Sequence, residues 1–342
     1  MTTKYFIGGD ISKSKIDFAL LNGSLDLKSE QIVSNRKPTL LKFLKKEIKS
    51  LKITATDLVV CCENTGIYST PLIQACLELG VFLWVENALK IKRASTDMRG
   101  KTDRQDARRI AEYACRYLDK AKAYQEPSDT VKELQRQSKI RETLISQRVG
   151  LESQIREAKT HDKALYDALK KGYASVLKQI ERSLAKVDER IKELSNAEEA
   201  IKHNIELLTS IQGVGLQTAL GFILYTNNFE NYENAKHLAC YSGVVPFANE
   251  SGTIQKRARV SHMSNHRLKR LLHLAAMSAI RANKELKAYY LRKVKEGKNK
   301  MSVLNAVRNK LVHRMFAVVQ RQTAYIQELN VPIKMEQIVL AS

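Results

Sequence analysis

The spacing of hydrophobic positions changes twice along the chain and predicts three regions. Up to about residue 126, short apolar runs alternate with amphipathic stretches, as in an α/β layer fold. The apolar run at 58–62 is typical of a buried central strand, and Asn22-Gly23 is a hairpin signal. We expect strands at 5–9, 16–21, 25–33, 58–62 and 81–85, and helices after Pro38, at 68–79 and at 103–118.

The second region, 127–205, reads as a helical coiled-coil arm. Proline is absent between Pro127 and Pro246, and apolar residues recur at alternating intervals of three and four from Leu177 to Leu194. The preceding stretch, 128–159, has a helical composition but a seam interrupted by polar residues such as Arg141. We therefore predict two long helices, with a bundle packed on its own domain as the alternative.

The third region, 206–330, is predicted to be mainly helical and is strongly basic. Between Ser251 and Arg321 there are 18 Lys or Arg residues and only two Glu, and these supply most of the formal charge of +22. Such a surplus favours a polyanionic partner, nucleic acid above all, over a merely solubilising surface. The segment from Ile211 to Ala219 matches a helix-hairpin-helix turn, in which Gly213 and Gly215 would let a phosphate approach the backbone.

Composition narrows the classes of protein to which the chain can belong. With 44% hydrophobic and 27% charged residues among 342, and no apolar run long enough for a membrane span, we expect a soluble cytoplasmic protein without a membrane partner. No signal-like stretch precedes Asp10. The five cysteines lack the spacing of a zinc site or a disulfide framework and are expected to be reduced core residues.

Four carboxylates are the candidate chemistry of the first region. Asp10 and Glu63 stand at the ends of two predicted central strands, and Asp103 and Asp106 share one face of a predicted helix. Each alone reads as a turn, strand-end or capping residue. As an ordered set in an RNase H-like strand pattern they favour a site for divalent ions, and Mg²⁺ prefers such oxygen ligands.

Several segments resemble the DEDD insertion-sequence transposases of the IS110 family, which are relatives of the Piv-type DNA invertases. They are GDISK at 9–13, ENTGIY at 63–68, KTDRQDA at 101–107, GVVP at 243–246, SG at 251–252, VS at 260–261 and LKRLL at 268–272. The resemblance implies a RuvC-like domain over 1–126 and a C-terminal transposase domain over 206–330.

The same resemblance implies an activity. It would make the chain a recombinase that cuts and rejoins DNA through a covalent phosphoserine, with Mg²⁺ held by Asp10, Glu63, Asp103 and Asp106 and with Ser251 as the nucleophile. It also implies a bridge RNA that pairs with target and donor DNA. Strand exchange needs at least two active sites, so we expect a homo-oligomer. The residues expected to contact nucleic acid are Gly213, Gly215, Lys256, Arg257, Arg259, Arg267, Lys269 and Arg270.

The sequence departs from the family pattern at three positions, and other functions remain as alternatives. Gly9 stands where the family has a bulky apolar residue and is expected to loosen its strand, and His262 and Ser264 replace Lys and Gly in a loop facing nucleic acid. A tyrosine recombinase assembled from Arg267, His273, Arg281 and Tyr289 or Tyr290 would leave the carboxylates unexplained. Two further alternatives are a structure-selective nuclease that resembles a Holliday-junction resolvase and a non-catalytic nucleic-acid-binding protein. Ser242, Ser261 and Ser264 compete with Ser251.

Overall fold

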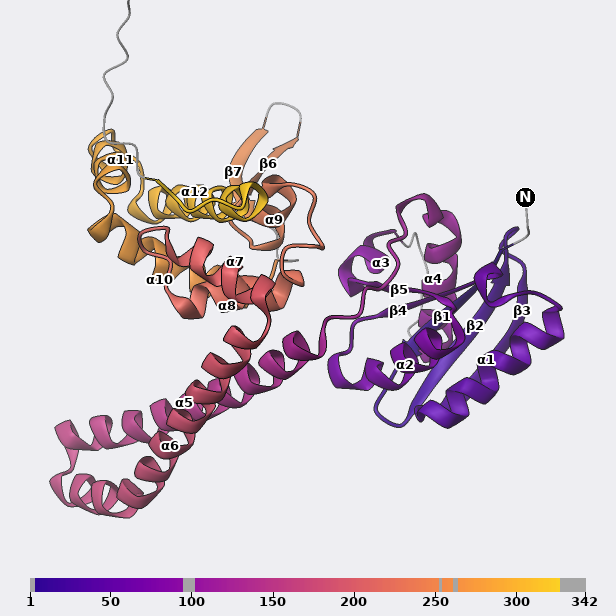
Figure 1. Ribbon diagram of the computed structural model, residues 1–342, viewed down its shortest axis with the longest axis horizontal. Helices are drawn as coiled ribbons and strands as arrows, with labels where there is room; N and C mark the ends of the chain where they lie inside the picture. Colours follow the sequence, from indigo (N-terminus) through magenta and orange to yellow (C-terminus); the bar gives the residue numbers. More distant parts are fainter. Residues whose placement is uncertain (1–3, 95–101, 252–253, 261–263, 327–342) are drawn as a thin grey trace, which may run out of the picture. The chain divides into compact units, whose positions relative to one another are not determined.

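In the computed structural model, which describes residues 4–94, 102–251, 254–260 and 264–326, the first part of the chain forms a five-stranded sheet (Figure 1). The strands lie in the order β3-β2-β1-β4-β5, with β1, β2 and β3 antiparallel and β4 and β5 parallel to β1. Their bounds are β1 Tyr5–Ile11, β2 Lys15–Asn22, β3 Leu27–Ser34, β4 Leu58–Glu63 and β5 Phe82–Glu86.

Helices cover both faces of this sheet because its strands alternate their apolar side chains between two cores. One core joins Ile7, Val60 and Cys62 to helices α1 and α2, and the other joins Phe6, Val59 and Cys61 to α3 and α4. The bounds are α1 Lys37–Leu51, α2 Thr70–Leu79, α3 Ala88–Ala94 and α4 Asp103–Arg116, with short 3₁₀ turns at Ala55–Asp57, Gly66–Ser69 and Leu118–Lys120.

The predicted strands and helices of this region are confirmed to within a few residues. The third strand begins at Leu27 rather than Leu25, because Leu25 takes a left-handed turn conformation with φ 66°. The helix expected at 68–79 starts with a 3₁₀ turn and ends at Gly80, whose φ of 67° suits a glycine C-cap. Helix α3 was not predicted.

The arm consists of two long helices, α5 Asp129–His161 and α6 Lys163–Ala197 (Figure 1). Side chains of the predicted seam, among them Ile180, Leu184 and Ile191, are buried within this one chain, where α5 and α6 pack together. Arg141, which interrupts the seam of the first helix, reaches Asp188 of the second through an Nε–Oδ1 contact of 2.6 Å. The polar interruption is therefore a contact between the two helices.

The rest of the chain is mainly helical, as expected, and also contains one hairpin, which was not predicted. Phe222, Leu268 and Leu311 lie in its core. The helices are α7 Glu199–Thr209, α8 Leu216–Thr226, α9 Ala235–Tyr241, α10 His266–Ala282, α11 Lys284–Lys295 and α12 Lys300–Arg321, and the hairpin strands are β6 Pro246–Ser251 and β7 Ile254–Val260.

Two compact units result, residues 1–126 and 127–342. The arm belongs to the second unit: Gln135 Nε2 donates to the carbonyl of Leu224 at 3.0 Å, which attaches α5 to α8. A division of this unit at residues 205 and 206 stays a prediction. Among the described helices, none has the length and apolar character that crossing a bilayer takes.

All five cysteines are free thiols. Cys61, Cys62 and Cys76 are core residues, as the sequence predicted, whereas Cys115 and Cys240 are only half-buried.

Candidate active site

The candidate site of the first unit lies where the ends of β1 and β4 meet the start of α4. Gly9 of β1 pairs with Cys62 of β4, so the next residues, Asp10 and Glu63, are neighbours on parallel strands. Asp10 is also directly opposite Asp17 on β2. Residues two apart in a strand share a face, and therefore Asp10 shares the face of Gly8, which α4 covers.

Two glycines allow this arrangement. A Cβ on Gly8 would lie 2.2 Å from the carbonyl oxygen of Ala107 and 2.3 Å from the nitrogen of Ala111, so only glycine lets α4 lie this close to β1. Gly9 faces the opposite core, where a Cβ would lie 3.0 Å from the Phe18 ring. Because Phe18 fills that space and Gly9 stays paired with both neighbouring strands, the expected loosening of the strand is wrong.

Helix α4 contributes the other two carboxylates. Thr102 caps its N-terminus, where the side-chain oxygen accepts a hydrogen bond from Gln105 N, and Asp103 and Asp106 lie in the first turn. An acidic first turn suits the positive end of the helix dipole. Asp103 pairs with Lys15 Nζ at 2.9 Å and Asp106 pairs with Arg109 Nη1 at 2.7 Å.

The electrostatics of the site centre on Asp10. Burial, together with the negative charges of Asp106, Asp103 and Glu63, raises the pKa of Asp10 to about 6. Burial also raises the pKa of Glu63, and Asp106 adds to the rise. The carboxylates of Asp10 and Glu63 have neither an ion pair nor a hydrogen bond to any described side chain. The negative charge of these two carboxylates, which no described side chain pairs, is what a bound metal ion would relieve.

Neighbouring carboxylates on the same sheet are compensated. Asp17 is buried against Lys15 at 2.9 Å, and Glu86, which pairs with Glu63 in the sheet, contacts Lys90 at 3.1 Å. Both were missed by the sequence analysis. A polar residue between Ile16 and Phe18, at a position where the strand is apolar on both sides, was the available signal for Asp17.

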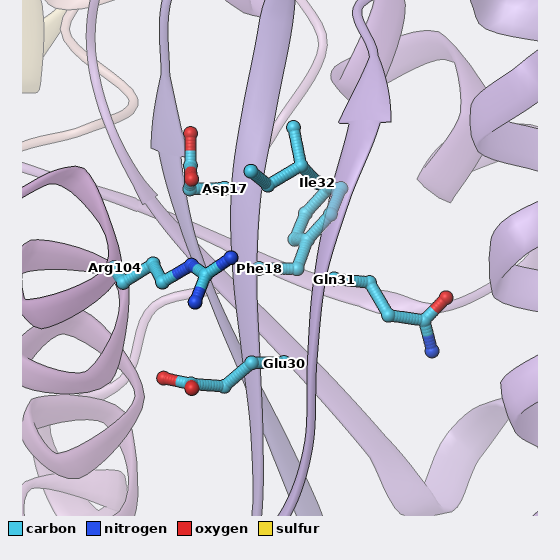
Figure 2. Close-up of a pocket in the computed structure, with 6 residues that line it drawn as sticks. All are labelled: Asp17, Phe18, Glu30, Gln31, Ile32 and Arg104. Atoms are coloured by element: carbon cyan, nitrogen blue, oxygen red, sulfur yellow. The ribbon is translucent and has the colours of Figure 1, made fainter.

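A small cleft beside Asp17 shows the same compensation. It is lined by Asp17, Phe18, Glu30, Gln31, Ile32 and Arg104. Figure 2 shows Arg104 reaching from α4 between the carboxylates of Asp17 and Glu30. Arg108 binds Glu30 with two nitrogens, and this bond, with a smaller contribution from Arg104, lowers the pKa of Glu30. The cleft is therefore a neutralised edge, unlike the Asp10 site.

The four carboxylates suit a metal ion in their chemistry and in their charge. Carboxylate oxygens at Asp10, Glu63, Asp103 and Asp106 are ligands suited to Mg²⁺. Within the described ranges, however, no three acidic, His or Cys side chains converge in a ligation geometry. Lys15 and Arg109 each hold one helix carboxylate by an ion pair. Metal binding would thus require these two carboxylates to exchange a side-chain cation for the metal.

The residues expected to contact nucleic acid lie in the second unit and divide into three groups. Ser251 ends β6, and Lys256, Arg257 and Arg259 follow on β7, where the backbone pairs Ser251 with Ile254. Their side chains, and Gly252, Ser261 and His262, lie outside what the structure describes. Ser264 is buried and is considered below.

Arg267 has an internal role. It ion-pairs with Glu142 of the arm, and its Nη1 donates to the hydroxyl of Tyr225 at 2.9 Å. It therefore links α10 to α5 and α8, and its expected contact with nucleic acid stays a prediction beside that role. Lys269 is half-buried and Arg270 is exposed on the same helix.

The two glycines of the predicted helix-hairpin-helix turn differ. Gly213 has a φ of 98°, and a Cβ there would lie 2.6 Å from Ala279 of α10, so helix packing explains this glycine. Gly215 is the N-cap of α8 and has no heavy atom within 4 Å of its missing Cβ. The space beside the backbone is thus open at Gly215 and occupied by α10 at Gly213.

The rival tyrosine set is not brought together by the described contacts. Arg267 binds Glu142 and Tyr225, His273 binds Arg308, and Tyr289 packs under Lys310. These partners are different, and none of the contacts joins two members of the proposed set.

Comparisons with known proteins agree on one group. A family model described as "Transposase", of the DEDD IS110 type, matches residues 7–160, and the model "Transposase IS116/IS110/IS902 family" matches residues 205–291. The pilin gene-inverting protein of Moraxella lacunata is 23% identical over 96% of this chain and 99% of its own length. The corresponding Moraxella bovis protein is 24% identical over 83% and 86%. A transposase for insertion sequence element IS1111A from Coxiella burnetii is 25% identical over 66% and 68%.

Proposed function

Because the chain belongs to the IS110 family of DEDD transposases, we propose that this DNA recombinase cuts and rejoins DNA with Ser251 as nucleophile and Asp10, Glu63, Asp103 and Asp106 as metal ligands. Transposase activity follows from the family. The residue roles, the covalent step and the partners below are our proposal. We also propose that the first unit is RuvC-like, which the strand order β3-β2-β1-β4-β5 supports.

One observation carries the proposal: Asp10 and Glu63 are adjacent, half-buried and uncompensated, while their acidic neighbours on the sheet are paired with Lys or Arg. A half-buried carboxylate costs free energy when it is ionised among other negative charges. An unpaired, half-buried carboxylate is expected where the function requires it to bind a divalent cation. We assign Mg²⁺ to Asp10 and Glu63 first, and to Asp103 and Asp106 after their ion pairs open.

When bound, Mg²⁺ would supply positive charge at the phosphate and ease deprotonation of the attacking hydroxyl. Asp10 and Glu63 hold fixed positions because they stand on paired strands. Asp103 and Asp106 stand in the first turn of α4. Lys15 and Arg109 balance the charges of these two carboxylates until a metal ion binds. These two cations are thus positioning residues for the helix carboxylates.

The covalent step belongs to Ser251. Its oxygen forms a bond to phosphorus, the bond from phosphorus to one deoxyribose oxygen breaks, and the proton of the serine ends on that leaving oxygen. The phosphodiester is replaced by a phosphoserine ester, so rejoining needs no external energy source. The support is its position: Ser251 ends β6 beside a strand that carries Lys256, Arg257 and Arg259.

We also propose nucleic-acid partners and an oligomeric state. The basic surplus between residues 251 and 321 supports binding to more than one strand of nucleic acid, including a bridge RNA beside target and donor DNA. Because the cutting and rejoining of two DNA molecules needs at least two nucleophiles, we propose a homo-oligomer as the active form.

The test is a cleavage assay on DNA that carries the ends of the insertion sequence. Asp10→Asn should abolish Mg²⁺-dependent cleavage while DNA binding keeps its salt dependence. Glu86→Gln is the matched control, because it neutralises a carboxylate at the end of the adjacent strand that Lys90 already compensates. Cleavage by Asp10→Asn at the wild-type rate would overturn the metal assignment.

A further inference from the structure

A basic cluster without an acidic partner among the described side chains lies in the second unit, on the helices that flank the β6–β7 hairpin in the chain. We call it the Arg308 cluster. It consists of Ser242 at the end of α9, Ser264 before α10, Lys269 and His273 on α10, and Arg308 on α12. Lys269 and His273 are four residues apart and therefore share one face of α10.

Close contacts hold these groups together. Arg308 Nη2 lies 2.5 Å from His273 Nδ1, and the guanidinium is the donor because it cannot accept. His273 Nδ1 is then the acceptor, which leaves the proton on Nε2. A Cβ on Gly243, whose φ is 67°, would lie 2.4 Å from Ser264 Oγ and 3.4 Å from Lys269 Cδ. The Ser264 hydroxyl and the Lys269 stem therefore meet at Gly243.

Helix α12 is fixed to the same turn. Asn305, one helical turn before Arg308, donates from Nδ2 to the carbonyl oxygen of Val244 at 2.8 Å. Arg308 follows one turn later on α12 and is only 7% exposed, and its guanidinium contacts His273 of α10. The hairpin starts at Pro246, shortly after this turn, so the chain runs from Ser242 of the cluster directly into the strand that ends at Ser251.

The charge of the cluster is uncompensated. Among the described side chains, Arg308 has no acidic partner, whereas Arg314 on the same helix binds Glu285 at 2.6 Å. Burial and the charge of Arg308 lower the pKa of both Lys269 and His273. Burying a cation without a partner is costly, and natural proteins rarely accept it without a ligand.

Unused hydrogen-bond donors accompany this charge. Arg308 Nε, Ser242 Oγ and Ser264 Oγ are buried and have no partner. Ser242 is fully buried and Ser264 is 7% exposed. An unmade bond at a buried donor costs about 1–3 kcal/mol, so three such groups, on the elements that border the Gly243 turn and His273, point to a missing acceptor. A tetrahedral oxyanion offers several acceptor oxygens together with the negative charge that the cluster lacks.

We propose that the Arg308 cluster binds one backbone phosphate of the DNA strand that Ser251 attacks. DNA as the source of the phosphate rests on the proposed function, but the anion site itself does not. A strand rises ~3.3 Å per residue, so Ser251 lies roughly 16 Å from the root of the hairpin, or about five base steps of about 3.4 Å. The phosphate held by the cluster is therefore about five base steps from the one that Ser251 attacks, so the cluster positions the strand and takes no part in bond breaking.

The anion site is tested first, without DNA. Thermal unfolding of the full chain is compared in sodium chloride and in sodium phosphate at equal ionic strength. Phosphate should raise the Tm of the wild type by about 2–4 °C, because a ligand of the folded state stabilises it. Arg308→Met should raise the Tm in chloride, since it removes an uncompensated buried charge, and should abolish the phosphate effect.

Two further variants make this test decisive. Lys269→Gln, at a half-buried position, should fold and lose most of the phosphate effect. Arg281→Met, an exposed charge on the same helix, is the control and should keep it. If Arg308→Met unfolds at a lower temperature in chloride and Lys269→Gln retains the full phosphate effect, the cluster is structural and the proposal is wrong.

The source of the phosphate is tested with a duplex DNA probe. Arg308→Met should weaken binding several-fold and reduce the slope of log affinity against log salt by about one, whereas Arg281→Met should leave the slope at the wild-type value. Unchanged DNA binding with a lost phosphate effect would mean that the cluster holds a free anion. A loss confined to an RNA duplex of the same sequence would also overturn the DNA assignment. Ser251→Ala should leave the phosphate effect on Tm and the salt dependence of DNA binding unchanged. A wrong assignment of the nucleophile would therefore not be confused with a wrong assignment of the anion site.

Discussion

At the scale of single residues, what distinguishes the candidate site is which carboxylates have a cation. Asp10 and Asp17 are opposite one another on β1 and β2, but only Asp17 has an ion pair, to Lys15. Asp10 instead has its pKa raised to about 6 by burial and by neighbouring carboxylates. The same substitution at these two positions should therefore have opposite effects on stability.

Asp10→Asn should stabilise the first unit above pH 6, in the presence of EDTA. The folded pKa of Asp10 lies above its unfolded value of 3.8, so the ionised form destabilises the fold at high pH, and protonation removes this penalty as the pH falls. Because Asp10 is only half-buried, we expect a gain of about 1–2 kcal/mol at pH 8 that vanishes below pH 4.

Urea unfolding followed by the fluorescence of Trp84 measures this, since Trp84 is the chain's one tryptophan and is buried in the first unit. Asp17→Asn is the control and should lower stability at pH 8 by leaving Lys15 without its buried partner. A destabilised Asp10→Asn at pH 8 would refute the crowding of charge at Asp10.

Gly8 is the residue that lets helix α4 pack closely on the sheet. Gly8→Ala should destabilise the first unit by about 1–3 kcal/mol, because the new Cβ would overlap the backbone of α4. Gly172→Ala in the arm meets nothing within 4 Å and should instead stabilise its helix by about 0.5–1 kcal/mol without moving the Trp84 transition. Equal Trp84 transitions for Gly8→Ala and the wild type would contradict the close packing of α4 on β1.

Sequence patterns predicted these residues unevenly. Asp10 and Glu63 were recognisable because each follows an apolar run, and Asp103 with Asp106 because they share a helix face. Lys15 and Asp17 were not, because the position of Asp17 opposite Asp10 depends on the antiparallel register of β2 against β1, and the contact of Lys15 with Asp103 depends on the packing of α4. The effect of Gly9 was misjudged because the space beside it is filled by Phe18, from a different strand.

At the scale of elements, strands and helices with a regular period were predictable, and their partners were not. The seam of α6 was found by its spacing, whereas its partner α5 has a mixed pattern, with Arg141 placed to reach Asp188. The β6–β7 hairpin was missed because its basic residues were read as part of helical repeats. The short helix α3 carries too few periodic positions to be distinguished from a loop.

The packing of the arm leads to a prediction. Ile180→Asp with Leu184→Asp should unfold the outer part of the arm, because both side chains are buried between α5 and α6 of one chain. Far-UV circular dichroism should show a loss of helix, while light scattering should give an unchanged oligomer mass. A lower mass with full helicity would mean that this seam joins two protomers.

At the scale of the whole molecule, the two units divide the chemistry. The uncompensated carboxylates are in residues 1–126, and the excess of basic residues and Ser251 are in residues 127–342. Neither unit alone contains both the proposed metal ligands and the proposed nucleophile. The proposed reaction would therefore need the carboxylates of one unit and Ser251 of the other on one DNA strand, within a protomer or between two.

The most direct test of the account is the fate of the protein after cleavage. DNA carrying the element's ends is incubated with Mg²⁺, the reaction is denatured, and the products are separated by mass and mapped by peptide sequencing. We expect a denaturation-resistant protein–DNA adduct at Ser251 that is absent without Mg²⁺, in Ser251→Ala and in Asp10→Asn. Free DNA ends with no adduct at any time point, or an adduct that persists in Ser251→Ala, would contradict it.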